Sequence, residues 1–184
     1  MPATALCEAA SSRLLLIDIQ ERLAAAMSKR EQVTRNVTHL LELARLKDLP
    51  VRVTEQYPKG LGHTVSELSD AMSTVQRFEK ISFSCCGEPG FMDHLKDPGR
   101  SKIVVCGMET HVCVLMTALD LLHEGFVVHV VADAVCSRHD DNWSTALSML
   151  RDAGAVVTST ETVLFQWLER AGSEEFKAIS KRIR

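Results

Sequence analysis

Short apolar runs alternate with amphipathic segments from one end of the chain to the other. Six runs have the length of a β-strand: Arg13–Asp18, Val51–Glu55, Gln76–Lys80, Lys102–Gly107, Phe126–Ala132 and Ala155–Ser159. Gln76–Lys80 is the least apolar of the six, whereas Lys102–Gly107 and Phe126–Ala132 are almost continuously apolar. Continuous apolar runs of this length are typical of strands buried on both faces of a parallel sheet.

Helical spacing of apolar residues marks three of the intervening segments: Asn36–Leu46, Val112–Glu124 and Asn142–Ala153. Gly125 and Gly154 follow the last two, at the position where a left-handed C-cap is expected. Thr158, followed three residues later by Glu161, predicts a capping box that opens a further helix, which extends through Glu169.

Strands that alternate with helices predict an α/β fold, in which right-handed crossovers place helices on both faces of a parallel sheet. The 184 residues suffice for one compact domain, and they contain no internal repeat, low-complexity tract or linker. We therefore expect a single domain over residues 13–184, preceded by a flexible lead over residues 1–12.

Net charge and hydropathy give no reason to expect nucleic acid or a membrane as a partner. The net charge of −3 gives no reason to expect nucleic acid, and the one basic cluster, Lys181, Arg182 and Arg184, suits the end of a helix. No apolar run is long enough to span a bilayer, so no membrane partner is expected. The stretch Met1–Ser12 contains Glu8 and lacks a basic region before an apolar block, so it does not resemble a signal peptide.

The six cysteines, at positions 7, 85, 86, 106, 113 and 136, are too sparse for a disulfide scaffold. No C-x-x-C pair suggests zinc binding or redox exchange. This usage indicates a reducing compartment, so we expect a cytoplasmic protein, with a mitochondrial location left open.

Polar residues whose side chains could take part in catalysis stand at the ends of several predicted strands. Asp18, Glu55 and Lys80 end the first three, and Gly107–Cys113 follow the fourth. Ligands of open parallel sheets bind beyond the carboxyl ends of the strands. A carboxylate, an ammonium group and a thiol are therefore expected at one edge of the sheet.

Cys113 is the candidate nucleophile. It falls in the first turn of a predicted helix for which Thr110 is a plausible N-cap. A helix start favours a thiolate, a nearby Lys80 is expected to lower its pKa further, and free amides there could hold an oxyanion. The alternative is a buried, inert thiol, which describes Cys106 in mid-strand better than Cys113.

Asp18 and Lys80 have alternative structural interpretations as a loop-capping carboxylate and a surface lysine. As functional groups, Asp18 is expected to act as a general base and Lys80 to keep it ionised. His111 lies two residues from Cys113, and residues two apart on a helix do not face each other. We therefore expect His111 to line the pocket mouth or a subunit contact.

No metal or cofactor site is expected. Glu55 is followed by Gln56 and Tyr57, and His63 stands eight residues after Glu55 with no second histidine at ligand spacing. The segment Ile19–Arg22 after the first strand is not a phosphate-binding glycine loop.

Three blocks of residues, in order, resemble the motifs of isochorismatase-like cysteine hydrolases: Leu14–Gln20, Lys80 with Phe83 and Ser84, and Gly107–Val114. The similarity extends over roughly Arg13 to Trp167. Thr54–Pro58 and Phe176–Lys181 are similar to the eukaryotic isochorismatase-domain proteins.

The resemblance implies a three-layer α/β/α fold with a six-stranded parallel sheet, and an Asp18, Lys80 and Cys113 triad. It implies a cis peptide between Met108 and Glu109, before Thr110, which directs backbone amides at the substrate carbonyl. The residues expected to shape the pocket are Gln20, Glu55, Gln56, Phe83 and His111. It also implies a homo-oligomer, a dimer or higher, that acts on a small molecule.

Two departures narrow the expected chemistry. Nicotinamidases of this superfamily carry an Asp-x-His metal motif after the second strand, where this chain has Glu55, Gln56 and Tyr57. Isochorismatases cleave a vinyl ether, some without the cysteine, so the presence of Cys113 favours C–N hydrolysis through a thioester.

Two alternatives of other classes remain: an interaction module without turnover, and a nuclease or RNA-binding protein. The complete triad speaks against the first. The second is disfavoured because the chain has one tyrosine, two tryptophans and no basic stripe.

Overall fold

The computed structural model describes residues 6–183, and within them six strands form one parallel sheet in the order β3-β2-β1-β4-β5-β6. The strands are β1 (Ser12–Ile17), β2 (Val51–Gln56), β3 (Arg77–Lys80), β4 (Lys102–Met108), β5 (Val127–Cys136) and β6 (Val156–Thr158). The predicted six-stranded parallel sheet is confirmed. The strand order reverses between β1 and β4, where ligand crevices of such sheets form.

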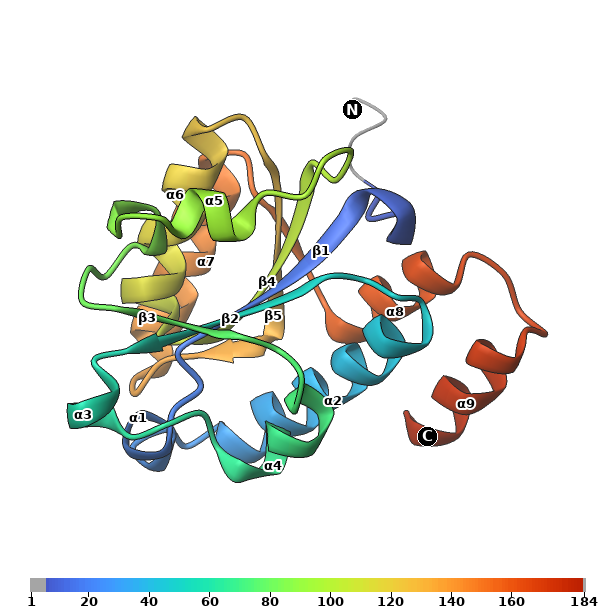
Figure 1. The fold of residues 1–184 in the computed structure, drawn as a ribbon, viewed down its shortest axis with the longest axis horizontal. Coiled ribbons are helices and arrows are strands. Elements are labelled where there is room, and N and C mark those ends of the chain that lie inside the picture. The colour runs from blue at the N-terminus through green and yellow to red at the C-terminus, as the bar shows by residue number, and fades with distance from the viewer. Residues whose placement is uncertain (1–5, 184) are drawn as a thin grey trace.

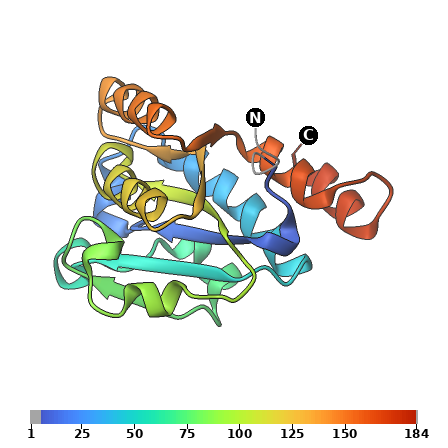
Figure 2. The same ribbon diagram turned by 90° about the horizontal axis from the view of Figure 1, so that it is seen from above.

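Helices cover both faces of the sheet, which gives the expected three layers (Figures 1 and 2). One face packs against α2 (Arg30–Leu46), α8 (Thr160–Leu168) and α9 (Glu174–Arg182). The other packs against α5 (Phe91–Leu95), α6 (Leu115–His123) and α7 (Asp140–Asp152). Three short helices belong to the segments that follow β1 and β2: α1 (Glu21–Ala25), α3 (Pro58–Leu61) and α4 (Ser66–Ser69).

Strand β1 shows why the apolar runs are continuous. Leu14 and Leu16 belong to the core beneath α2 and α8, whereas Leu15 and Ile17 belong to the core beneath α6 and α7. Because successive side chains of a strand point to opposite faces, a strand covered on both sides needs apolar residues at every position.

Gly107 brings the end of β4 against the end of β1. Its φ is +136°, and a Cβ at this position would collide with the carbonyl oxygen of Ile17. Only glycine allows this approach. The close contact sets the residue after Ile17, Asp18, beside the segment that follows β4.

Element ends differ from prediction in several places. Strand β5 continues to Cys136, past a register shift in its pairing with β4, and α2 begins six residues earlier than predicted. The N-cap of α8 is Ser159, whose hydroxyl accepts from the Thr162 amide, so the capping box predicted from Thr158 is wrong by one position. Gly125 and Gly154 have positive φ, as expected of C-caps.

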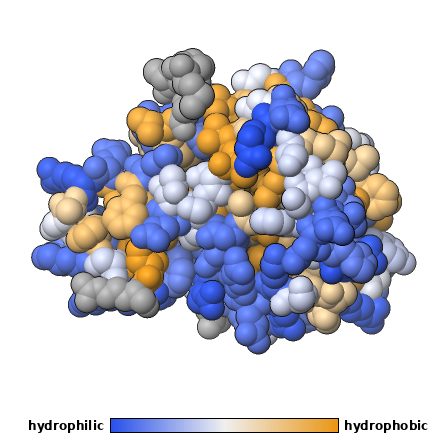
Figure 3. All heavy atoms as spheres, turned by 180° about the vertical axis from the view of Figure 1, so that it is seen from behind, coloured by the Kyte–Doolittle hydropathy of each residue, from blue (hydrophilic) through white to orange (hydrophobic). Residues whose placement is uncertain are grey.

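Part of the expected flexible lead packs on the domain. Cys7 is fully buried, and its amide donates to the Gln166 side chain at 2.9 Å. Residues 1–5 of that lead lie outside the described residues. In residues 6–183, no helix is both long and apolar enough to cross a membrane. The view from behind shows a largely polar surface with apolar groups in small patches (Figure 3).

Candidate active site

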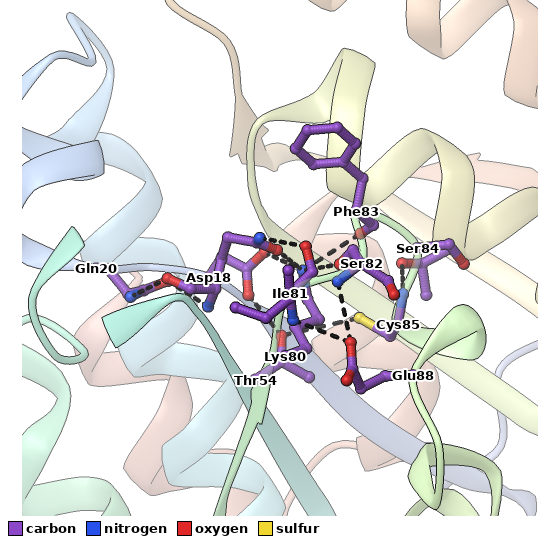
Figure 4. Close-up of polar contacts among 12 residues, drawn as sticks. Asp18, Gln20, Thr54, Lys80, Ile81, Ser82, Phe83, Ser84, Cys85 and Glu88 are labelled. Carbon is purple, nitrogen blue, oxygen red and sulfur yellow. Dashed lines mark hydrogen bonds and ion pairs between the residues drawn. The ribbon is translucent and has the colours of Figure 1, made fainter. Parts of the chain in front are cut away.

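Asp18 and Lys80 form a fully buried ion pair at the carboxyl ends of β1 and β3 (Figure 4). Lys80 Nζ lies 2.7 Å from Asp18 Oδ2, and both side chains are 0 % exposed. Two opposite charges removed from water remain ionised only when each has close polar partners. Further partners surround both groups.

The two oxygens of Asp18 have different environments. Oδ1 accepts a hydrogen bond from Thr54 Oγ1 at 2.8 Å. Oδ2 faces the Lys80 ammonium and accepts no hydrogen bond of regular geometry from the described residues. The backbone of Asp18 is left-handed, with φ +54°, where the chain leaves β1.

Three further oxygens surround the Lys80 ammonium. It donates to Gln56 Oε1 at 2.7 Å and to the carbonyls of Ser82 and Phe83, each at 3.2 Å. Burial by itself lowers the pKa of Lys80, yet the charge of Asp18 and the other anionic neighbours raise the pKa above its usual value. Lys80 is therefore a cation at neutral pH.

Cys113 lies beside this pair, in a π-helical turn, Thr110–Val114, that leads into α6. The residue is 6 % exposed. Burial and the charge of Asp18 raise the pKa of its thiol to about 12, and Lys80 offsets this only in part. The expectation of a thiolate with a lowered pKa is therefore wrong. Cys113 therefore rests as a neutral thiol at neutral pH.

The turn before Cys113 follows a cis peptide bond between Met108 and Glu109, as the resemblance implied. Thr110 is not the N-cap. Glu109 occupies that position without a side-chain cap, and Thr110 Oγ1 is buried with no hydrogen-bond partner among the described residues. The Val112 and Val114 amides donate to the Glu109 carbonyl at 3.1 and 3.3 Å, so they are not free to bind an oxyanion.

The carboxylate of Glu109 anchors the end of β5. It accepts from the backbone amide of Arg138 at 2.9 Å and from Arg138 Nε at 3.1 Å. The side chain of Met108 is fully buried. These contacts hold the segment that carries Cys113 against the carboxyl ends of β4 and β5.

Gln20 and Gln56 extend the network around Lys80. Gln20 pairs with the backbone of Gln56 through both of its side-chain atoms, at 2.7 and 3.0 Å. Gln56 then presents Oε1 to Lys80. Gln20 therefore contributes to the site through Gln56.

The side chain of Glu55 is directed elsewhere, although it also lies near the carboxyl end of β2. Its Oε1 accepts from the Thr64 amide and hydroxyl at 2.8 and 2.7 Å, and its Oε2 lies 3.0 Å from His63 Nδ1. This side chain closes the loop that follows β2, and none of its hydrogen bonds reaches Asp18, Lys80 or Cys113.

Phe83 and His111 lie at the periphery. The carbonyl of Phe83 binds Lys80, but its ring is exposed and points away from the ion pair (Figure 4). His111 Nδ1 lies 2.9 Å from Ser137 Oγ, and its Nε2 lies 3.4 Å from Asn142 Nδ2. The histidine is thus held by the end of β5 and by α7.

Sequence reasoning missed two members of the buried cluster, Thr54 and Cys85. The Cys85 thiol donates to Thr54 Oγ1 at 3.9 Å, and its backbone amide donates to Thr117 Oγ1 at 2.9 Å. Thr54 precedes Glu55 in a predicted strand, so the sequence does place it near the carboxyl end of that strand. A single threonine in a strand, however, does not change the hydrophobic pattern, so the sequence does not indicate what its hydroxyl binds.

All six cysteines are free, and in residues 6–183 no group of three or more histidine, cysteine, aspartate or glutamate side chains is arranged to hold a metal ion.

The family profile of the isochorismatase domain matches residues 12–162. The chain belongs to the isochorismatase family. The secreted isochorismatase effector Isc1 of Phytophthora sojae is 42 % identical over 179 residues, which cover 95 % of this chain and 85 % of that protein. Isochorismatase domain-containing protein 2A of Mus musculus is 38 % identical over 177 residues, which cover 95 % of this chain and 83 % of that protein.

A solved structure described as the MAR1 ribonuclease from Caenorhabditis elegans has the same fold, with a TM-score of 0.90. It is 36 % identical to this chain, and the match covers 97 % of this chain and 92 % of that one.

Proposed function

We propose that this isochorismatase-family hydrolase cleaves a C–N bond of a small amide through a thioester on Cys113. The observation that carries the proposal is the buried Asp18–Lys80 ion pair, whose Asp18 charge acts directly on the neighbouring Cys113 thiol. A thiol with a raised pKa is a poor nucleophile until a base removes its proton. Asp18 is that base.

The steps balance without a cofactor. Asp18 takes the thiol proton as Cys113 Sγ attacks the amide carbonyl, and a tetrahedral oxyanion forms. The oxyanion collapses to the thioester while Asp18 gives the proton to the departing amine. Water, deprotonated by Asp18, then attacks the thioester, and the carboxylic acid leaves as Cys113 recovers its proton.

Backbone amides of the Thr110–Val114 turn other than those of Val112 and Val114 hold the oxyanion in this scheme. Gln20 and Gln56 support Lys80, Glu55 shapes the neighbouring loop, and Phe83 and His111 line the entrance. The exposed apolar side chains near β2 and β3, Tyr57, Ile81 and Phe83, provide a surface for a homo-oligomer contact.

A vinyl ether is the alternative substrate class. Its hydrolysis requires protonation of a carbon–carbon double bond and no thiol nucleophile, so Cys113 would then be dispensable. An intact Cys113 beside Asp18 favours the amide.

The test is a panel of small carboxamides and vinyl ethers, assayed with the wild-type protein and with Cys113→Ala. Turnover of an amide, an acyl adduct on Cys113 by intact mass, and loss of both in Cys113→Ala are expected. Full activity of Cys113→Ala with no adduct on any substrate would exclude the covalent scheme. A protein that binds ligands and never turns them over would instead be an interaction module.

Hydrolysis of RNA is a second candidate, because a 36 % identical protein of the same fold is described as a ribonuclease. The net charge of −3 and the burial of the triad argue against a polyanionic substrate. RNA cleavage by highly purified protein that survives both Cys113→Ala and Asp18→Asn would support a separate nuclease site.

A further inference from the structure

Thr54 stands behind the general base, on the strand next to it. The residue is fully buried in β2, and its hydroxyl donates to Asp18 Oδ1 at 2.8 Å (Figure 4). Lys80 takes the other oxygen, Oδ2. The two partners approach from different strands, so together they define the rotation of the Asp18 carboxylate about its last bond.

Cys85 sets the direction of the Thr54 hydroxyl. The Cys85 thiol donates to Thr54 Oγ1 at 3.9 Å, so this oxygen acts as an acceptor on that side. The single hydroxyl proton is then left for Asp18. Cys85 is itself buried, and its amide is fixed by Thr117, which lies one helical turn after Cys113.

We propose that Thr54, supported by Cys85, is a positioning residue that occupies Oδ1 of Asp18 and leaves Oδ2 to exchange the proton with Cys113. This inference rests on the proposed function. Thr54 has no hydrogen bond to the Cys113 thiol among the described residues. It acts through the carboxylate, by fixing its orientation and by stabilising its charged form.

The hydroxyl can be removed without breaking the sheet. The backbone of Thr54 independently accepts from the Asp18 amide at 3.2 Å, and β1 and β2 pair along four residues. Thr54→Val keeps the shape of the side chain and this pairing. Thr54→Ser restores the hydroxyl.

The measurement is the rate of alkylation of Cys113 by iodoacetamide between pH 4 and 9, followed by peptide mass spectrometry. Wild-type protein should show an acid limb, where protonation of the base stops the reaction. Thr54→Val should move this limb up by about one pH unit, because a carboxylate that loses a donor holds its proton more tightly. It should also lower the plateau by about tenfold, because the carboxylate is no longer held in one orientation toward Cys113. Thr54→Ser should return both values close to wild type.

Two matched control variants distinguish the positioning role of Thr54 and Cys85 from a general effect of altering a buried side chain. Thr34 is also buried, and its hydroxyl has no hydrogen-bond partner among the described residues, so Thr34→Val should leave the profile unchanged. Cys85→Ala should lower the plateau by about twofold to fivefold, since a thiol is a weak donor. Cys106→Ala removes a buried thiol in the middle of a strand and should leave the plateau of the alkylation rate unchanged.

The outcomes are distinguishable. A wild-type acid limb that Thr54→Val leaves in place would show that Thr54 only packs the sheet, and it would overturn this inference alone. Wild-type alkylation with no acid limb would overturn the proposed function as well. If Thr54→Val does not fold, Cys85→Ala against Cys106→Ala decides, and equal profiles for the two would count against the inference.

Discussion

Asp18 and Glu55 are two buried carboxylates at the ends of neighbouring strands, yet their partners differ in origin. The partners of Asp18 come from β2 and β3, up to 62 residues away in the chain. Those of Glu55, Thr64 and His63, lie within nine residues of it. One carboxylate joins distant parts of the sheet, and the other closes a loop.

Under the proposed function, the hydrogen-bond partners, more than the position at a strand end, distinguish a reactive carboxylate from a structural one. Glu55 has hydrogen bonds on both oxygens, from two donors on Oε1 and one on Oε2. Among the described residues, Asp18 accepts a hydrogen bond of regular geometry on Oδ1 alone. Its Oδ2 forms the ion pair with the Lys80 ammonium at 2.7 Å. An oxygen with a remaining lone pair beside a thiol can take a proton.

The largest effect is expected from neutralising the two carboxylates in turn. Asp18→Asn should slow the alkylation of Cys113 by iodoacetamide at pH 7 by about 10²–10⁴-fold, because the amide cannot accept the thiol proton. Glu55→Gln should stay within about twofold of wild type. Rate constants from peptide mass spectrometry test both.

Equal losses in the two variants would contradict the distinction between a reactive and a structural carboxylate. Circular dichroism and urea unfolding of both proteins serve as the control, since a rate measured on unfolded protein would carry no information.

The next effect concerns stability. Lys80→Met leaves the Asp18 charge buried without its counter-ion and should lower the free energy of unfolding by about 3–5 kcal/mol, measured by urea denaturation. Asp18→Asn combined with Lys80→Met should recover much of this loss. Lys59→Met, at an exposed lysine, should cost less than about 0.5 kcal/mol. A cost below about 1 kcal/mol for Lys80→Met would show that water reaches the pair.

The sheet, and the meeting of Asp18, Lys80 and Cys113 at one edge of it, follow from the sequence because both depend on short-range patterns. The apolar run Leu14–Ile17 predicts a buried strand, and the rule of strand ends then selects Asp18, Lys80 and the segment before Cys113. The predicted N-cap of α8 is wrong by one residue, because Thr158 and Ser159 both have a hydroxyl that can cap a helix. Thr158 is the last residue of β6, so the cap is Ser159.

The side-chain contacts of the candidate site and the pKa of Cys113 depend on strand register and burial, which no local stretch of the sequence determines. Gln56 binds Lys80 because these residues stand side by side in the β2–β3 pairing. Thr54 reaches Asp18 for the same kind of reason, across β1 and β2. The pKa of Cys113 was expected to fall, and it rises because burial and the Asp18 charge outweigh Lys80.

A smaller loss of stability is expected at the loop carboxylate. Glu55→Gln weakens the charge-assisted hydrogen bonds from Thr64 and His63 and should lower the free energy of unfolding by about 1–3 kcal/mol. Glu79→Gln is the matched control, since Glu79 stands beside Glu55 in the sheet and is exposed. Urea denaturation of the two variants measures the difference. Equal costs would mean that Glu55 does not hold the loop.

The smallest effect is the pH dependence of the Glu55–His63 contact. Burial raises the pKa of Glu55, but hydrogen bonds from Thr64 and His63 outweigh it and hold the pKa below the usual 4.5. Glu55 therefore contributes stability above pH 4.5 that is lost as the pH falls through its folded pKa. The hydrogen bond and charge of Glu55 raise the pKa of His63 above 6.5, so its contribution is complete below 6.5 and is lost as the pH rises through that raised pKa.

The contact is therefore strongest between pH 4.5 and 6.5. His63→Gln should lower the melting temperature by about 1 °C at pH 5.5 and by less at pH 8.5, because the histidine is exposed and solvent screens the pair. His123→Gln, at the end of α6, should show no such difference between the two pH values. A loss from His63→Gln that is larger at pH 8.5 would reverse the sign of the argument and would mean that neutral His63, not its cation, stabilises the loop around Glu55.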